Sequence, residues 1–273
     1  MNALLPKLGI LAGGGAAPLR VMEACRAQKR DFFVICIEGQ ADKNLAHDAP
    51  HIWLPLGAVG KFRELIKAEK IIEITLIGHV RRPSLSELKP DLLAMKALAK
   101  IGMNLLGDDA LLRAVGQAIE EECGVRVIGA HEILGGILMR EGNLGKQGAD
   151  EQAQNDIMRG VTVARALGQV DVGQSVIVQQ GLVLGAEAIE GTDALIARCK
   201  NLRRDGPGGI LVKLAKPQQD ERYDLPTIGP NTILAAAEAG LRGIAIEAER
   251  SLIIDRDQVR QLADEKGLFV VGI

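Results

Sequence analysis

Short apolar runs alternate with amphipathic stretches along this chain, and the alternation predicts its fold class. Three stretches carry apolar positions at helical spacing: residues 59–70, 91–101 and 109–122. The apolar runs between and around them cover residues 8–12, 32–37, 74–78, 124–129 and 210–214. Strands that alternate with helices favour a parallel sheet with short right-handed crossovers. The chain is therefore predicted to be an α/β protein.

The pattern weakens after residue 130, where five glycines occur before residue 150 without a steady period. Domain boundaries fall in such stretches. We therefore predict an N-terminal α/β domain with a Rossmann-like parallel sheet at residues 1–132, a linker at 133–150, and a C-terminal catalytic α/β domain at 151–273.

A hairpin is predicted in the second domain. Two apolar runs, residues 175–179 and 182–186, are separated only by Gln180-Gly181. A two-residue connection of this kind joins antiparallel strands. The second sheet is accordingly expected to be mixed.

Composition narrows the possible partners and compartments. Of the 273 residues 47% are hydrophobic but only 2% are aromatic, so Leu, Ile, Val and Ala must build the core. A net charge of -2 and scarce stacking platforms argue against nucleic acid as the main partner. Four cysteines without a CxxC pair indicate reduced thiols and no zinc cluster. No signal peptide or spanning run is evident, so we expect a cytoplasmic protein, with peripheral membrane contact left open.

A charged loop follows one apolar run and demands explanation. The run at residues 210–214 contains Lys213, although an unpaired ammonium inside a strand is costly. Two prolines and five charged residues come next: Lys216, Asp220, Glu221, Arg222 and Asp224. Cations neutralise phosphate oxygens, and carboxylates hold magnesium or position a water. A solvated loop with self-paired charges is the alternative, and composition leaves the two interpretations open.

Carboxylates also crowd the segment that follows residue 186. Glu187, Glu190 and Asp193 lie within seven residues, where a strand passes into a helix that Thr192 or Asp193 can cap. Such carboxylates repel unless a cation joins them. Mg²⁺, or pairing with Lys213, Lys216 or Arg222, would resolve the repulsion, while a capped and solvated turn is the alternative.

The N-terminal domain offers a second set of ligand-binding candidates. The turn Gly13-Gly14-Gly15 links a strand to a helix and could aim backbone N–H groups at a phosphate, although it lacks a full dinucleotide fingerprint. Glu38 ends the next strand, where a ribose-binding acid often lies. A tight turn and an exposed glutamate are the alternative.

The strand at residues 74–78 ends in further candidates. His79, Arg81 and Arg82 follow Gly78, on the side of a parallel sheet that usually binds ligands. Two arginines there can clamp a phosphate or simply be solvated. Asp109 lies at the start of a predicted helix, where it can cap the helix or face the ligand-binding site.

Long motifs then point to a family. LGILAGGGAAP, GHVRRP, GDDALLRAV, DVGQSVIVQQG, EAIEGTD, VKLAKPQQDERYDLPTIGP and ADEKGLFVVG span essentially the whole chain. In these motifs the chain resembles the LpxI family of UDP-2,3-diacylglucosamine pyrophosphatases of lipid A synthesis. The resemblance implies Mg²⁺-dependent hydrolysis to UMP and 2,3-diacylglucosamine 1-phosphate, two α/β domains with the active site between them, and an essential aspartate in the DLP segment, Asp224.

The resulting hypothesis is that charged side chains of residues 187–224 converge on a diphosphate and its metal ion. The expected catalytic residues are Asp224, Lys213 and Arg222, and the expected magnesium ligands are Asp224, Glu187, Glu190 and Asp193. Substrate contacts are expected from Ala12, Gly13, Gly14, Glu38, Gly78, His79, Arg81, Asp109, Gln174, Thr192 and Lys216. A sugar-nucleotide transferase and a non-catalytic nucleotide-sensing module are the alternatives, and base rates favour a homodimer.

Overall fold

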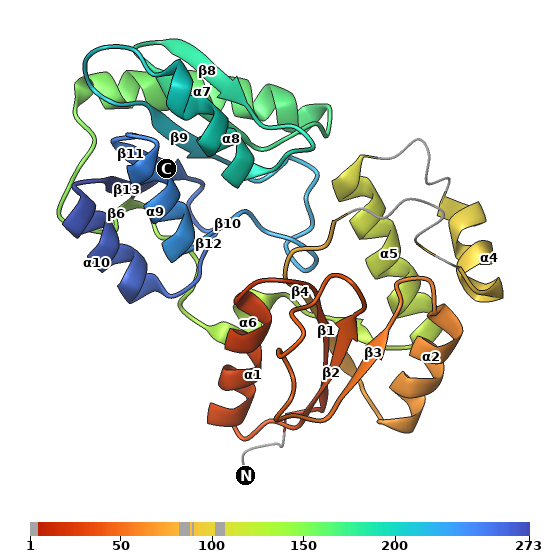
Figure 1. Ribbon diagram of the computed structural model, residues 1–273. Coiled ribbons are helices and arrows are strands. Elements are labelled where there is room, and N and C mark those ends of the chain that lie inside the picture. The colour runs from red at the N-terminus through yellow and green to blue at the C-terminus, as the bar shows by residue number, and fades with distance from the viewer. Residues whose placement is uncertain (1–4, 82–87, 89, 102–106) are drawn as a thin grey trace. The chain divides into compact units, whose positions relative to one another are not determined.

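The computed structural model describes residues 5–81, 88, 90–101 and 107–273, and it divides into two compact units (Figure 1). Unit 1 comprises residues 1–135 together with Asp220–Asp224, and unit 2 comprises residues 136–219 and 225–273. The predicted α/β class is confirmed in both units. Within the described residues, no helix combines the length and the apolar character needed to cross a membrane.

Unit 1 is built on a five-stranded parallel sheet. Its strand order is β3-β2-β1-β4-β5, and each pair of neighbours is parallel. The strands are β1 (Leu8–Ala12), β2 (Phe32–Ile37), β3 (His51–Leu54), β4 (Glu73–Ile77) and β5 (Arg126–Val127). The helices are α1 (Ala17–Ala27), α2 (Val59–Ala68), α4 (Leu92–Ile101), α5 (Asp108–Cys123) and α6 (Ala130–Leu134).

The two faces of this sheet bury different side chains because successive residues of a strand point to opposite sides. Val34 and Cys36 pack with α1 on one face, whereas Phe33 and Ile35 pack with α2 and α5 on the other. The unit is therefore a sheet covered by helices on both faces, as nearly continuous apolar strands require.

Unit 2 is built on a six-stranded mixed sheet of order β6-β13-β11-β9-β7-β8. The strands are β6 (Gly142–Asn143), β7 (Ser175–Gln179), β8 (Leu182–Ala186), β9 (Ile210–Lys213), β11 (Gly243–Ile246) and β13 (Phe269–Gly272). The predicted hairpin is confirmed: β7 and β8 are antiparallel, and Gln180 and Gly181 have φ of 53° and 78°. Positive φ at both turn residues matches the right-handed twist of the strands.

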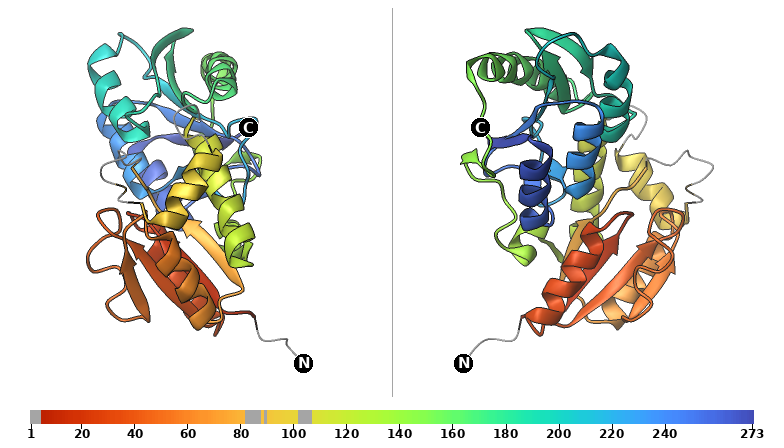
Figure 2. Two further views of the ribbon diagram at one scale, coloured as in Figure 1. Left: turned by 90° about the vertical axis from the view of Figure 1, so that its right-hand side faces the viewer. Right: turned by 60° about the vertical axis from the view of Figure 1, so that its left-hand side comes forward.

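Helices cover both faces of this sheet as well (Figure 2). Helix α7 (Glu151–Gln169) packs on one face, and α8 (Thr192–Cys199), α9 (Pro230–Glu238) and α10 (Arg256–Lys266) pack on the other. A short 3-10 helix (Lys200–Leu202) follows α8, and a two-stranded parallel sheet joins β10 (Thr227–Ile228) to β12 (Leu252–Ile253).

The stretch predicted as a linker, residues 133–150, takes up structure in both units. Ile133 is buried in the core of unit 1 at the end of α6, and the glycine pair that follows has positive φ. Beyond Gly135 the chain belongs to unit 2, where β6 pairs with β13. The glycine-rich stretch that lacks a regular sequence pattern therefore contains the end of one short helix and one short edge strand.

A five-residue segment of the C-terminal half belongs to unit 1. The chain leaves unit 2 after Gln219, runs through Asp220–Asp224 in unit 1, and is back in unit 2 at Leu225. We call Asp220–Asp224 the strap. Tyr223 within it is only 5% exposed and forms part of the unit 1 core.

Candidate functional site

One edge of the unit 2 sheet collects buried charged and hydroxyl side chains. Lys213, the last residue of β9, lies opposite Ser175, the first residue of antiparallel β7, and beside Ile246, the last residue of β11. The end of β8 reaches the same edge because Ala186 pairs with Val176. The carboxyl ends of the parallel strands lie here, which is the side that binds ligands in α/β proteins.

A hydrogen-bond network holds Lys213 at this edge. Its Nζ donates to Thr192 Oγ1 at 3.0 Å and to the carbonyl oxygen of Thr227 at 3.2 Å. The Thr192 hydroxyl donates to Glu187 Oε1 at 2.7 Å, so the hydroxyl of Ser175, 3.3 Å from Thr192 Oγ1, must donate to it. The backbone N–H of Gln174 donates to the other carboxylate oxygen of Glu187 at 3.1 Å.

The network places an ammonium and a carboxylate close together without direct contact. Lys213 is 8% exposed and Glu187 is 7% exposed, and the Thr192 hydroxyl bridges them. Within the described part of the chain, Lys213 donates to two neutral oxygens only. An ammonium has three N–H groups, so one remains to meet an anion. The carboxylate of Glu187 offsets the charge of the buried ammonium.

Lys216 lies in a second, tighter pairing in unit 2. Its Nζ donates to Asp171 Oδ1, and both side chains are largely buried. The neighbouring N–H of Ala215 donates to Glu247 Oε2 at 2.9 Å. This lysine already has a carboxylate partner, so it is less suited than Lys213 to receive a phosphate oxygen.

Three of the four predicted magnesium ligands, Glu187, Glu190 and Asp193, belong to unit 2 and do not form a ligand group by themselves. Glu187 is engaged by Thr192 and Gln174, as described, and Asp193 is exposed in the first turn of α8. Asp224 belongs to unit 1, whereas the other three belong to unit 2. Across the residues that the structure describes, no group of three or more His, Cys, Asp or Glu side chains could hold a metal ion.

Glu190, the remaining predicted ligand, is an ion-paired turn residue. Its carboxylate accepts from Arg198 at 2.9 Å and from the N–H of Ala188 at 3.1 Å. Hydrogen bonds from its own backbone N–H and from Arg198 lower the pKa of Glu190. These contacts are compatible with the alternative interpretation, a capped and solvated turn.

The glycine turn of unit 1 directs its amides at the chain itself. Gly14 and His79 exchange two backbone hydrogen bonds, of 2.9 and 2.8 Å, and Gly13 N–H donates to the Ile77 carbonyl. Gly15 N–H donates to Asp42 Oδ2 at 3.2 Å. A Cβ on Gly13 would lie 2.5 Å from the carbonyl oxygen of His79. Close approach of backbone segments therefore explains Gly13 and Gly14, and phosphate contact by Ala12, Gly13 or Gly14 stays a prediction.

The other candidate ligand-binding residues of unit 1 differ in their exposure and in their hydrogen-bond partners. Glu38, His79 and Arg81 are exposed, and the backbone of Arg81 is bound at its N–H and carbonyl by the side chain of Gln40. Asp109 is buried at the start of α5, with Oδ2 3.8 Å from a guanidinium nitrogen of Arg113 one turn later. Gly78, with φ of 98°, forms the bend after β4, and Arg82 lies outside the described residues.

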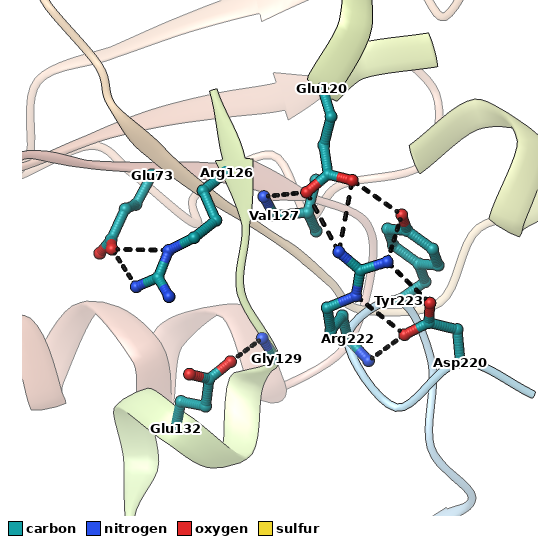
Figure 3. Close-up of polar contacts among 9 residues, drawn as sticks. All are labelled: Glu73, Glu120, Arg126, Val127, Gly129, Glu132, Asp220, Arg222 and Tyr223. Atoms are coloured by element: carbon teal, nitrogen blue, oxygen red, sulfur yellow. Dashed lines mark hydrogen bonds and ion pairs between the residues drawn. The ribbon is translucent and has the colours of Figure 1, made fainter. Parts of the chain in front are cut away.

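The strap is anchored in unit 1 by its tyrosine (Figure 3). The ring of Tyr223 packs so closely on α5 that a Cβ added to Gly116 would lie 2.2 Å from it. The Tyr223 hydroxyl donates to Glu120 Oε2 at 3.2 Å. Burial raises the pKa of Tyr223 to about 12, so the phenol keeps its proton for this bond.

Arg222 is surrounded by carboxylates of the same unit. It donates to Asp220 through Nε at 3.1 Å and Nη2 at 2.8 Å, and through Nη1 to both oxygens of Glu120 at 3.2 and 3.3 Å. Its guanidinium stacks on Tyr223 at 4.9 Å from the ring centroid, and its hydrogen bond lowers the pKa of Asp220. These contacts give Arg222 an anchoring role, and its part in phosphate binding stays a prediction.

Three residues of these networks escape sequence reasoning: Glu120, Tyr223 and Asp171. Glu120 lies in an ordinary amphipathic helix, and its partners are more than a hundred residues away. Tyr223 did carry a signal, since it is the only tyrosine in the chain and lies inside a highly charged loop. Lone aromatic residues in polar loops usually bury their rings.

Comparisons with known proteins support one family throughout. Residues 7–137 match the LpxI N-terminal domain, and residues 140–271 match the LpxI C-terminal domain. The chain is 41% identical over 274 aligned residues to the UDP-2,3-diacylglucosamine pyrophosphatase LpxI of Caulobacter vibrioides, covering 98% of this chain and 97% of that protein.

Likeness to solved structures is weak. The Bordetella bronchiseptica enzyme WbmG, in complex with NAD and UDP, is 12% identical over 97% of this chain and 81% of that one, with a TM-score of 0.36. A Thermus thermophilus UDP-glucose 4-epimerase in complex with NAD is 12% identical over 96% and 84%, with a TM-score of 0.34. Scores this low carry no argument about fold or ligand. The two domain matches and the near full-length likeness to the Caulobacter protein decide the matter: the chain belongs to the LpxI family.

Proposed function

We propose that this protein hydrolyses the pyrophosphate bond of UDP-2,3-diacylglucosamine, releasing UMP and 2,3-diacylglucosamine 1-phosphate for lipid A synthesis. The observation that carries the proposal is the 41% identity, over nearly the full length of both chains, to a protein named for that activity. The buried ammonium of Lys213 at a ligand-binding sheet edge is consistent with a diphosphate substrate.

Lys213 supplies the first requirement of the reaction. A pyrophosphate resists attack because its negative oxygens repel a nucleophile, so catalysis needs charge neutralisation at fixed positions. Thr192 and the carbonyl of Thr227 hold the ammonium in one place before substrate binds. A charge-assisted hydrogen bond from Lys213 to a phosphate oxygen would contribute about 1.5–3 kcal/mol.

Asp224 supplies the second requirement, activation of water. Its carboxylate is exposed at the end of the strap, where a water molecule can reach it. In the proposed step a water oxygen bonds to phosphorus, its proton passes to Asp224, and the bridging P–O bond breaks with its electron pair on the departing phosphate. Arg222 supports the strap and takes no part in this step.

Asp224→Asn tests the assignment. The amide keeps the size of the side chain but cannot accept the proton, so turnover should fall by roughly 10²–10⁴-fold while substrate still binds. UMP release from UDP-2,3-diacylglucosamine, resolved by thin-layer chromatography, measures turnover. Near-normal turnover would remove Asp224 from the chemistry. UMP absent from the wild-type reaction until an acceptor is added would indicate a transferase, and binding without any product a sensing module.

Magnesium dependence is a second, separate prediction. A bound Mg²⁺ would neutralise phosphate oxygens, but the predicted carboxylates of unit 2, Glu187, Glu190 and Asp193, form no ligand group by themselves, so we assign it no step. We expect EDTA to abolish UMP release and added Mg²⁺ to restore it. Full activity in chelator would show that Lys213 and the other cations suffice.

The substrate class also implies a location and an assembly to test. A diacylated sugar nucleotide resides at a membrane surface, so we propose a cytoplasmic protein in peripheral contact with the inner membrane. Co-sedimentation with vesicles that contain the substrate measures this contact. The homodimer favoured by base rates is tested by analytical ultracentrifugation.

A further inference from the structure

The strap raises a question that the proposed reaction does not answer, namely what holds Asp224 in place. Asp224 is the last residue of a five-residue segment whose neighbours on both sides belong to unit 2. Within the strap, the N–H of Asp224 donates to the carbonyl oxygen of Asp220 at 3.3 Å, and so does the N–H of Tyr223 at 3.0 Å. The conformation of the strap therefore sets the direction in which Asp224 leaves the backbone.

Glu120 is the group on which the strap converges. One carboxylate oxygen accepts the backbone N–H of Val127 at 2.9 Å, which ties Glu120 to the last residue of β5. The two oxygens together accept from Arg222, at 3.2 and 3.3 Å, and one of them accepts from Tyr223 at 3.2 Å. Glu120 thus contacts the two residues that immediately precede Asp224, and Figure 3 shows all of these bonds meeting at its carboxylate.

Two further contacts of the strap bear on its depth in unit 1 and on its internal shape. The Tyr223 ring is buried against Gly116, and Asp220 accepts two hydrogen bonds from the guanidinium of Arg222 and one from its backbone N–H within the strap itself. A ring held only by packing can still turn and slide, whereas hydrogen bonds from the ring hydroxyl and from a guanidinium to one fixed carboxylate define an orientation. That carboxylate is Glu120.

We propose that Glu120 is a positioning residue for this reaction, acting through Tyr223 and Arg222 to hold the carboxylate of Asp224 in its working orientation. The inference rests on the proposed role of Asp224 as the proton acceptor. Displacement of a reacting group by about 1 Å can cost about 10²-fold in rate. Glu120 is placed here in an indirect role, through Tyr223 and Arg222, so its effect should appear in turnover and not in substrate binding.

Glu120→Gln is the first test. The amide oxygen can still accept from Val127, but the charge that holds Arg222 is lost and the Tyr223 bond weakens. We expect kcat to fall about 10- to 100-fold, with KM for UDP-2,3-diacylglucosamine within about 3-fold of the wild-type value. Tyr223→Phe, which keeps the ring and the Glu120–Arg222 pair, should lower kcat by less, about 3- to 10-fold. A wild-type kcat in Glu120→Gln would overturn the proposal.

Glu69→Gln is the matched control. Glu69 also lies in unit 1 and pairs with a cation, Lys7, at 2.6 Å, with both side chains about one-third exposed or less. This pair touches no residue of the strap, so kcat should change by less than about 2-fold. Thermal unfolding of both variants separates a loss of folded protein from a loss of turnover per folded molecule.

A variant in the Asp224→Asn background distinguishes positioning from general support. If Glu120 acts only through Asp224, then Glu120→Gln should have little further effect on the residual turnover of Asp224→Asn, measured in long incubations. An equal fold-loss in both backgrounds would overturn the proposal and assign Glu120 a structural role. Normal turnover of Asp224→Asn alone would instead reject the proposed function of Asp224, so the two failures are distinguishable.

Discussion

The edges at which the parallel strands of the two sheets end are built in different ways. In unit 1, backbone groups close the edge: Gly14 and His79 bond to each other, and Gly13 bonds to Ile77. In unit 2, buried side chains occupy the edge, with Lys213 and Glu187 joined through Thr192. A glycine-rich turn looks like an anion site in sequence, but its amides are available only if the chain itself does not use them. A buried ammonium with neutral partners is the stronger sign of an anion site.

Among the substitutions that test this comparison, Lys213→Met should cause the largest loss of activity. Methionine keeps much of the apolar stem and removes the ammonium, so kcat/KM for UDP-2,3-diacylglucosamine should fall about 100-fold, the value of one strong charge-assisted bond. Lys200→Met is the matched control, because Lys200 lies in the same unit and pairs with Glu238 on the surface. That change should cost less than about 2-fold. Equal effects of the two variants would remove Lys213 from the site.

Gly78→Ala should affect stability more than catalysis. Gly78 has φ of 98°, and a Cβ there would lie 2.8 Å from the carbonyl oxygen of Gly14. We expect the free energy of unfolding, measured in urea, to fall by about 2–4 kcal/mol. Gly39→Ala, with φ of 72° but no heavy atom within 4 Å of the new Cβ, should cost only about 1 kcal/mol.

The same variant also tests whether the unit 1 edge binds substrate. Turnover per folded molecule of Gly78→Ala should remain within about 2-fold of the wild type at low temperature if the glycine serves only the fold. A rise in KM without a matching loss of stability would show that this edge contacts the substrate, as the sequence hypothesis has it.

Glu190→Gln should have the smallest effect. Glu190 pairs with Arg198 on the surface of unit 2, and such pairs contribute about 0–1 kcal/mol. We expect UMP release to change by less than about 2-fold, with an unchanged dependence on Mg²⁺ concentration. A large shift in the Mg²⁺ concentration for half-maximal activity would restore Glu190 as a metal ligand.

Most of the fold could be predicted from sequence because its signals are local. The apolar runs of β1, β2, β4 and β9 and the Gln180-Gly181 turn each lie within a few residues of chain. Lys213 was recognisable for the same reason, since a lysine inside an apolar run stands out wherever the strand lies. Thr192 and Glu187, which surround Lys213, could also be placed from sequence, because both follow the end of a predicted strand.

The partners of the charged loop could not be predicted in this way. Sequence placed residues 216–224 in one C-terminal site, but Asp220–Asp224 fold into unit 1 with Glu120, and Lys216 pairs with Asp171 in unit 2. The pairs that join this loop to other segments, Lys216 with Asp171 and Arg222 with Glu120, are 45 and 102 positions apart. A composition of mixed charges is compatible with many such pairings, and it resembles a metal site even where the carboxylates are already bound to arginine and lysine.

The strap also has a consequence for how the chain is made. Because Tyr223 fills the space above Gly116, the N-terminal unit lacks part of its interior until residue 223 has been synthesised and has left the ribosome. A fragment that ends at Gly135 would expose the apolar surface that this ring covers. About four-fifths of the chain must therefore be synthesised before unit 1 can complete its core. An isolated unit 1 would need residues 220–224, DERYD, supplied as a separate peptide.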